Sequence, residues 1–238
     1  MPVAIITGAS RGLGLALAES LAADGWDLVV DGRDARALTA AAEHLESTIA
    51  ATGGAALVRA VAGDVADPAH RAALVDAATA RGGVDLLVNN ASVLGPSPQA
   101  RLAEYPLDVL AHVYAVNTVA PLALVQLALP RLRARAGAIV NITSDAAVEP
   151  YEGWGGYGSS KAALEQLGNI LGAEEPGVRV YTFDPGDMRT QMHQEAFPGE
   201  DISDRPEPET VVPALRALLR DAPPSGRYRG ADVTVVTS

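Results

Sequence analysis

The sequence lacks cysteine entirely and is poor in aromatic and basic residues. Without cysteine among its 238 residues, the chain has no disulfide, no thiol nucleophile and no cysteine-ligated zinc site. Aromatic residues make up only 4% of the chain against 48% hydrophobic residues, so aliphatic side chains must form most of the core. The 18 Lys and Arg are outnumbered by 29 Asp and Glu, and the net charge of −11 argues against binding of nucleic acid.

The sequence also lacks a long hydrophobic run and a cluster of metal ligands. Its most apolar stretch, residues 119–129, is interrupted by Pro121 and Gln126 and is too short for the roughly 20 residues of a membrane-spanning helix. No secretory signal precedes the first apolar run, so we expect a cytoplasmic protein without a membrane partner. The four histidines lie far apart in the sequence and predict no metal site: His44, His70, His112 and His193.

Short β-favouring apolar runs alternate with helical patterns along the chain. This alternation is typical of βαβ units, in which helices cover both faces of a parallel sheet. We therefore predict an α/β fold: a single Rossmann-type doubly wound domain over residues 1–238, with a seven-stranded, mostly parallel sheet. The predicted strands span residues 3–7, 27–31, 55–61, 84–89, 138–143, 178–183 and 232–236.

One segment, residues 187–208, departs from this alternation. It is rich in proline, glycine and acidic residues, and it follows Pro185 and Gly186 at the carboxyl end of a predicted strand. Ligands bind at this edge of open α/β sheets, so we expect the segment to be a substrate lid rather than a disordered loop. His193, within this lid segment, either contacts a substrate or is a solvated surface residue.

Tyr157 and Lys161 lie four residues apart in a predicted helix. Residues i and i+4 share one face of a helix, so we expect the Lys161 ammonium beside the Tyr157 phenol. A fixed cation lowers the phenol pKa from its usual value of about 10, which would let Tyr157 exchange a proton with a carbonyl or an alcohol. Taken alone, so short a pattern also fits a surface lysine beside a half-buried tyrosine.

A glycine-rich segment follows the first predicted strand and opens a helix. Gly8, Gly12 and Gly14 have the spacing G-x-x-x-G-x-G, which permits a tight turn and close approach of a pyrophosphate to the backbone. The unpaired N–H groups and partial positive charge of the helix N-terminus would face that pyrophosphate. A glycine-rich turn with only a structural role is the alternative.

These two motifs and several others follow one another along nearly the whole chain. The others are Asp64-Val65, Asn89-Asn90-Ala91, Asn117, Ser144 and Pro185-Gly186. Together they resemble the classical branch of the short-chain dehydrogenase/reductase family, although Ser92 stands where glycine is customary. Residues 174–180, Gly153-Trp154 and Thr190-Gln191-Met192 resemble its sepiapterin and benzil reductase branch, which would imply a vicinal dicarbonyl substrate.

The resemblance implies four catalytic residues: Asn117, Ser144, Tyr157 and Lys161. Tyr157 would donate the proton, and Lys161 would lower the pKa of Tyr157 and hold the nicotinamide ribose. Ser144 would hydrogen-bond the substrate oxygen, and Asn117 would connect Lys161 to a chain of water molecules. From the sequence alone, Ser144 could instead be a turn residue at a strand end, and the Asn117 side chain could bond to nearby helix backbone.

The residues after the second predicted strand bear on the choice between NAD(H) and NADP(H). An acid there would accept from the 2′-hydroxyl of NAD, whereas arginine would neutralise the 2′-phosphate of NADP. In the family's register Gly32 replaces the acid, Arg33 follows it and Arg11 lies in the glycine loop, so we expect NADP(H). A shift of one residue would instead place the Asp31 carboxylate at the ribose. By resemblance, the cofactor-binding residues are Gly8, Ser10, Arg11, Gly12, Leu13, Gly14, Arg33, Asp64, Val65, Asn90, Ala91, Tyr157, Lys161, Pro185, Gly186, Met188 and Thr190.

The resulting hypothesis is NADPH-dependent reduction of a ketone or vicinal dicarbonyl to the alcohol, with Trp154, Met192 and Phe197 contacting the substrate. The alternatives are an NAD-dependent alcohol dehydrogenase and a nucleotide-sensing protein without turnover. We also expect a homodimer, because two predicted helices have apolar faces that could pair across a two-fold axis, unless they are buried within the monomer. These faces comprise Leu122, Val125 and Leu129 on one helix and Leu164, Leu167 and Leu171 on the other.

Overall fold

Seven strands form the centre of the fold in a computed structural model that describes residues 1–235. They are β1 (Val3–Ile6), β2 (Asp27–Gly32), β3 (Val58–Ala62), β4 (Leu86–Asn89), β5 (Ala138–Ile142), β6 (Arg179–Asp184) and β7 (Gly226–Arg229). Their order in the sheet is β3-β2-β1-β4-β5-β6-β7, and every pairing between them is parallel. The direction of winding reverses between β1 and β4, which makes this the switch point of a doubly wound sheet.

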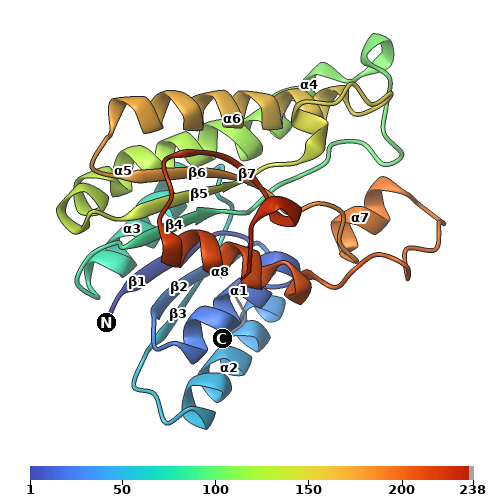
Figure 1. Ribbon diagram of the computed structural model, residues 1–238. Helices are drawn as coiled ribbons and strands as arrows, with labels where there is room; N and C mark the ends of the chain where they lie inside the picture. The colour runs from blue at the N-terminus through green and yellow to red at the C-terminus, as the bar shows by residue number, and fades with distance from the viewer. Residues whose placement is uncertain (236–238) are drawn as a thin grey trace.

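Helices cover both faces of this sheet (Figure 1). They are α1 (Gly12–Ala23), α2 (Ala35–Ala51), α3 (Pro68–Thr79), α4 (Leu107–Tyr114), α5 (Ala120–Arg135), α6 (Gly155–Glu174), α7 (Gln191–Ala196) and α8 (Val212–Asp221). α1, α2 and α8 pack on one face, and α3, α5 and α6 pack on the other. The predicted α/β fold with a seven-stranded parallel sheet is therefore confirmed.

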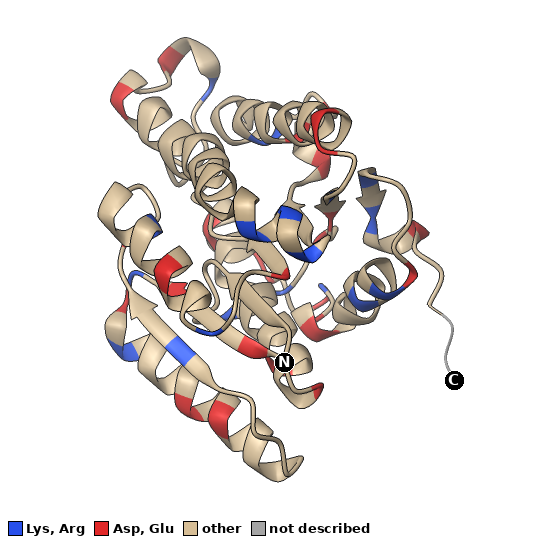
Figure 2. Cartoon of the chain, turned by 90° about the vertical axis from the view of Figure 1, so that its left-hand side faces the viewer, with Lys and Arg blue, Asp and Glu red and all other residues tan. Residues whose placement is uncertain are grey.

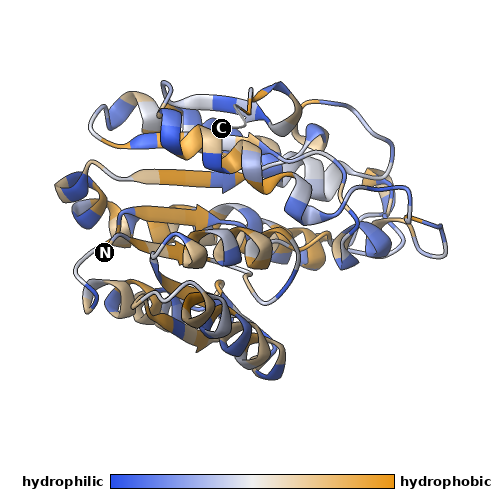
Figure 3. Ribbon diagram, turned by 60° about the horizontal axis from the view of Figure 1, so that its bottom comes forward, coloured by the Kyte–Doolittle hydropathy of each residue, from blue (hydrophilic) through white to orange (hydrophobic). Residues whose placement is uncertain are grey.

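The central strands are apolar because both of their faces are covered. All four residues of β1 are fully buried, and the strands form the hydrophobic centre in Figure 3. Acidic and basic residues are interspersed over the outer helices and loops (Figure 2). This distribution lets a chain with few aromatic residues build a core from aliphatic side chains.

The seventh strand does not lie where the apolar pattern predicted it. The structure places β7 at Gly226–Arg229, and only a short 3-10 turn follows, at Gly230–Asp232. The predicted strand at residues 232–236 was wrong within the described part, and residue 236 lies outside it. Apart from Tyr228, which packs against the core, β7 is polar, and Arg227 forms ion pairs with Glu165 and Asp184, each at 2.9 Å. Hydrophobic periodicity does not detect a strand held in this way.

α4 and α5 belong to one continuous helical run, Leu107–Arg135, joined by a π-helical turn at Ala115–Val119. This run is long and apolar enough to cross a membrane, so the length predicted from residues 119–129 was too short. Half of its most apolar window is buried inside the fold, where α5 packs on the sheet. The run is weak evidence for a membrane span, because the core helix of a compact domain passes the same test.

The apolar faces expected to pair two copies are largely buried within one chain. Val125 and Leu164 are each only 3% exposed, and Leu129 and Leu171 pack against the core. Burial within the monomer, the alternative left open by the sequence, therefore accounts for most of these positions. The apolar side chains that do face solvent on the same helical run and on α6 include Val119, Leu127 and Ile170.

Candidate active site

A cleft of about 1540 Å³ brings together most of the predicted site residues. Pockets for drug-sized ligands hold roughly 300–1,000 Å³, so this cleft has room for a dinucleotide together with a substrate. The predicted residues that line it are Gly8, Ser10, Arg11, Gly12, Leu13, Arg33, Asp64, Val65, Asn90, Ala91, Ser144, Trp154, Tyr157, Lys161, Pro185, Gly186, Met188, Thr190, Met192 and Phe197. Gly14 and Asn117 do not line the cleft and support its wall from behind.

The glycine loop between β1 and α1 has the geometry of a pyrophosphate site. Gly8 has a φ of +66° and Gly12 a φ of +57°, a backbone conformation that side chains with a Cβ rarely adopt. A Cβ added to Gly14 would lie 2.6 Å from the Gly8 carbonyl oxygen, so only glycine permits this packing. Within residues 1–235 no side chain caps the N-terminus of α1, which leaves its first N–H groups available to an anion.

Thr7 ties the glycine loop to the end of β4, a role that the sequence reasoning missed. The Thr7 hydroxyl accepts hydrogen bonds from the backbone N–H groups of Asn90 and Ala91, each at 3.0 Å. The Asn90 amide donates to the carbonyl oxygens of Thr7 at 2.8 Å and Gly8 at 3.1 Å. These hydrogen bonds therefore hold the loop after β1 and the loop after β4 together on either side of the switch point.

Two acidic side chains near the end of β2 are already occupied. The Asp31 side chain is buried; it accepts from the Gly8 N–H at 2.5 Å and contacts His70 Nε2 at 3.0 Å. Asp34 caps α2 by accepting from the N–H groups of Arg36 and Ala37. Asp31 thus holds the glycine loop through one oxygen and contacts His70 through the other.

Arginine side chains line the same part of the cleft. Arg33 is exposed and makes no ion pair within residues 1–235. Arg11 donates to the side-chain oxygen of Gln191, which lies on α7 in the lid segment. This contact links the glycine loop to the lid segment across the cleft. The pair provides the guanidinium groups that a 2′-phosphate would need.

Ser144 and Tyr157 are brought together by a close contact between α6 and the turn after β5. A Cβ at Gly158 would clash with the Ala146 carbonyl oxygen, so glycine lets the start of α6 approach this turn. The Tyr157 side chain is buried, and burial raises the pKa of its phenol, while hydrogen bonding to Ser92 and Ser144 opposes the rise. The Ser144 hydroxyl donates to Asp145 Oδ1 at 2.9 Å.

Lys161 lies one turn after Tyr157, as the spacing predicted. Its Nζ is 5.5 Å from the centroid of the Tyr157 ring and donates to the Ile142 carbonyl oxygen at 2.8 Å. The side chain is buried, and burial lowers the pKa of Lys161 to about 7. The expected lowering of the Tyr157 pKa by Lys161 was therefore wrong for the protein alone, because burial disfavours the charged form of both groups.

Asn117 occupies the π-helical turn between α4 and α5 and is fully buried. Its amide nitrogen donates to the Val93 carbonyl oxygen at 2.9 Å and to the Ser160 hydroxyl at 3.0 Å. Its carbonyl oxygen accepts from the Val93 N–H at 2.9 Å. The alternative of a bond to nearby helix backbone is wrong, since Asn117 instead joins the end of β4 to α6. Such π-turns are frequent at functional sites.

Ser92 is a second residue whose role the sequence reasoning missed. Its hydroxyl donates to Asn117 Oδ1 at 3.1 Å. Hydrogen bonding between Ser92 and the Tyr157 phenol lowers the pKa of that phenol, against the rise that burial causes. Ser92 stands where the family pattern has glycine, and it gives the site a further hydroxyl beside Tyr157.

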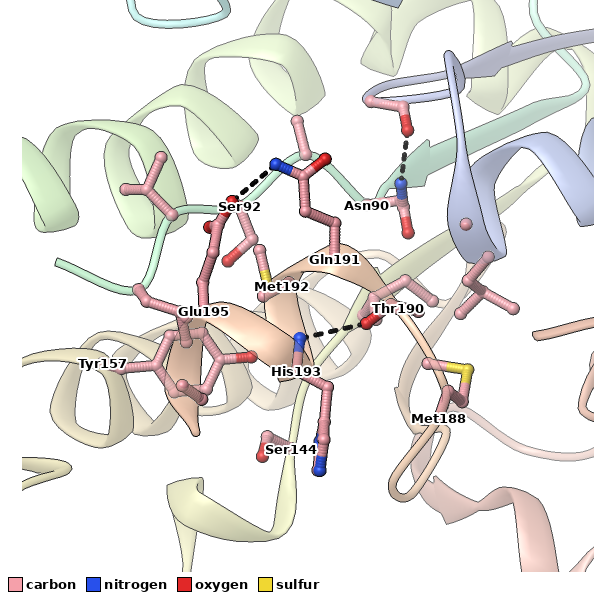
Figure 4. Close-up of a pocket in the computed structure, with 18 of the residues that line it drawn as sticks. Asn90, Ser92, Ser144, Tyr157, Met188, Thr190, Gln191, Met192, His193 and Glu195 are labelled. Carbon is pink, nitrogen blue, oxygen red and sulfur yellow. Dashed lines mark hydrogen bonds between the residues drawn. The ribbon is translucent and has the colours of Figure 1, made fainter. Parts of the chain in front are cut away.

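The far end of the cleft is apolar and aromatic. Trp154 contacts Tyr157 edge to face at a centroid distance of 5.8 Å and lies 5.8 Å from the Phe197 ring. Met192 and Phe197 pack against the same cluster as Tyr157. Figure 4 shows Ser144, Tyr157, Met192 and His193 around this end, with Asn90, Met188 and Thr190 toward the glycine loop. An aromatic ring could pack against these side chains.

Comparisons with known proteins agree with this geometry. The short chain dehydrogenase family matches residues 2–201. A benzil reductase from Saccharomyces cerevisiae that forms (S)-benzoin is 34% identical over 200 residues, covering 81% of this chain and 74% of that protein. Sepiapterin reductase from Mus musculus is 33% identical over 203 residues, covering 81% and 76%.

A solved structure shares the whole fold. The alcohol dehydrogenase of the archaeon Thermococcus sibiricus, complexed with 5-hydroxy-NADP, superposes with a TM-score of 0.84 at 29% identity and covers 96% of this chain and 95% of its own. The family match, the relatives and the fold all indicate the same family. The chain therefore belongs to the short-chain dehydrogenase/reductase family and is an NAD(P)-dependent oxidoreductase acting on CH–OH and C=O groups.

Proposed function

We propose that this protein uses NADPH to reduce a ketone or vicinal dicarbonyl to the alcohol, with Tyr157 as the proton donor. The observation that carries the proposal is the convergence of Ser144, Tyr157 and Lys161 at one end of a cleft whose other end is the glycine loop. Carbonyl reduction is also the activity named for the benzil and sepiapterin reductases. Bound NADPH would supply the hydride to the carbonyl carbon.

Side chains of the protein would bind and protonate the carbonyl oxygen. Ser144, by turning from Asp145, and Tyr157 would both hydrogen-bond that oxygen and stabilise its developing charge. Because burial raises the pKa of Tyr157, the phenol stays protonated until an alkoxide, which is the stronger base, takes its proton. The phenolate left behind would draw a proton onto the Lys161 amine, whose pKa is about 7.

The preference for NADPH over NADH rests on the surroundings of the adenosine ribose. Both oxygens of the Asp31 carboxylate already have a partner, Gly8 and His70, which makes Asp31 a poorer acceptor for the ribose hydroxyls of NAD. Arg11 and Arg33 supply positive charge on the same side of the cleft. A phosphate is therefore stabilised at this position more than a pair of hydroxyl groups.

The substrate is proposed to carry an aromatic ring next to its carbonyl. Trp154 and Phe197 give the substrate end flat apolar surfaces, and Leu94 and Met192 complete the lining. Benzil, a vicinal dicarbonyl with two phenyl rings, is the substrate named for the yeast relative. It suits both the oxygen-binding hydroxyls and the aromatic lining.

The test is loss of NADPH absorbance with benzil, diacetyl and acetophenone as substrates. Turnover of benzil is expected, with a lower rate on acetophenone. Tight NADPH binding without turnover of any carbonyl would contradict the proposal and favour a nucleotide sensor. Faster oxidation of alcohols with NAD than reduction with NADPH would favour an NAD-dependent alcohol dehydrogenase.

The cofactor choice is tested by Arg33→Asp. Loss of a charged hydrogen bond to the phosphate should lower kcat/KM for NADPH relative to NADH by about 10- to 100-fold. Arg36→Asp, an exposed position on α2 outside the cleft, is the matched control and should leave this ratio unchanged. An unaltered ratio in Arg33→Asp would refute the role assigned to Arg33.

We also propose that two copies associate in solution through the exposed apolar side chains Val119, Leu127 and Ile170. Contact between them would remove apolar surface from water. Light scattering should give twice the mass of one chain. A Val119→Asp and Leu127→Asp double variant should then be monomeric, whereas a monomeric parent protein would refute the association.

A further inference from the structure

His193 has a largely buried side chain whose ring makes no hydrogen bond within residues 1–235. Its side chain is only 10% exposed, so it is not the solvated residue that the sequence left open. Within residues 1–235 neither ring nitrogen makes a hydrogen bond, and the nearest carboxylate oxygen, Asp187 Oδ1, lies 3.8 Å from Nδ1. Neither ring nitrogen is among the fully enclosed polar atoms that lack a partner, and His193 lines the cleft, so the imidazole is open to a ligand bound there.

The position of His193 is fixed by contacts that lead to Tyr157. Its backbone N–H donates to the Thr190 hydroxyl at 3.2 Å at the start of α7. The imidazole lies 4.9 Å from the Phe197 ring, and Phe197 contacts Trp154, which contacts Tyr157. His193 also lines the cleft at the same end as Ser144 (Figure 4). The imidazole is therefore held within the substrate end of the cleft.

Neighbouring polar side chains of α7 are already paired. The Gln191 amide nitrogen donates to Glu195 Oε1 at 2.7 Å, and its oxygen accepts from Arg11. Leu94, Met192 and Phe197 give this end an apolar cluster, while polar side chains from other elements, including Ser97, His112 and Tyr151, also line the cleft. Among the described residues of α7, His193 is thus the side chain placed to recognise a second polar atom of a substrate.

We propose that His193 hydrogen-bonds a second oxygen on the carbon next to the reacting carbonyl, and so selects vicinal dicarbonyls over simple ketones. This inference rests on the proposed function, in which Ser144 and Tyr157 hold the reacting oxygen. The imidazole would then provide the polar contact that the second carbonyl oxygen loses on leaving water. A ketone without that oxygen would leave the imidazole unsatisfied.

A matched pair of substrates tests the inference, since deoxybenzoin is benzil without one carbonyl oxygen. His193→Phe keeps a ring against Phe197 and removes both nitrogens. It should lower kcat/KM for benzil by about 10- to 100-fold, the effect of one lost hydrogen bond to a buried group, and change kcat/KM for deoxybenzoin by less than about 3-fold. His193→Gln, which retains an N–H donor, should recover part of the loss on benzil.

The Kd for NADPH, followed by fluorescence, should be the same in both variants and shows that the cleft is intact. An equal loss on both substrates, or an unchanged rate on benzil, would overturn the role of His193 while leaving the proposed function standing. Turnover of neither substrate by the parent protein would instead overturn the proposed function, and this inference with it.

Discussion

Two buried ionisable side chains distinguish the site at the level of single residues. Tyr157 and Lys161 are both removed from water, and burial moves their pKa values in opposite directions. In the protein alone the uncharged form of each is favoured. In the proposed reaction the lysine would act less as a permanent cation than as a base that becomes charged when a phenolate forms beside it.

Burial of Lys161 makes the stability of the protein depend on pH. The Lys161 pKa is about 7 in the folded protein and 10.5 in the unfolded chain. Between these values the unfolded chain binds more protons, so stability rises with pH across this window. Below about pH 7 the folded protein carries the full cost of a buried ammonium.

Lys161→Met should therefore raise the free energy of unfolding of the nucleotide-free protein by about 1–3 kcal/mol below pH 7. The gain should shrink as the pH rises from about 7 to 10.5. Urea denaturation at a series of pH values measures both effects. A variant less stable than the parent at low pH, or a gain independent of pH, would contradict the assignment.

Asp31 provides a second prediction at the residue scale. The Asp31 carboxylate accepts from the Gly8 N–H and contacts His70. Asp31→Asn should therefore loosen the glycine loop, which would bind the pyrophosphate of either cofactor. We expect kcat/KM for NADPH and for NADH to fall by similar factors, about 3- to 10-fold each. His70→Gln should have the same uniform effect. A loss confined to NADH would show that Asp31 binds the ribose instead.

At the scale of secondary structure, local patterns predicted the parts of the site that lie within one element. The spacing of Tyr157 and Lys161 and the glycines after β1 are periodic or turn signals, and both lie where they were expected. Contacts between elements left no such signal. Thr7 and Ser92 acquire their roles only when β1, β4 and α6 come together.

The lid segment and the last strand also could not be predicted from local sequence patterns. Residues 187–208 contain the short helix α7, which the irregular composition did not predict. β7 is held partly by charge, through the ion pairs of Arg227 with Glu165 and Asp184. Both elements depend on residues far away in the sequence, and a pattern within one element carries no information about such contacts.

The ion pairs of β7 give a prediction at this scale. Arg227→Ala should lower the free energy of unfolding by about 2–4 kcal/mol, because it removes the cation beside the buried Glu165 carboxylate and leaves Asp184 with only the more distant Arg229. Arg229→Ala on the same strand is the control. Arg229 is exposed and 4.0 Å from Asp184, so its loss should cost less than about 1 kcal/mol. Equal costs in denaturant titrations would show that the two ion pairs do not hold β7.

At the scale of the whole molecule, the winding of the sheet assembles the site. The switch point between β1 and β4 brings the glycine loop, the end of β5 and the lid segment to one edge, although they are separated by most of the chain. The cofactor end is built from turns after strands, whereas the substrate end is completed by α7. The cofactor end follows the pattern of the family, and we propose that α7 determines which substrate binds.

The central claim is that Tyr157 donates the proton in NADPH-dependent carbonyl reduction, and Tyr157→Phe tests it most directly. The measurement is kcat for benzil reduction alongside the Kd for NADPH. We expect kcat to fall by about 100- to 10,000-fold, the usual contribution of a general acid, while NADPH binding changes by less than about 3-fold. Equal rates in the variant and the parent protein would contradict the claim.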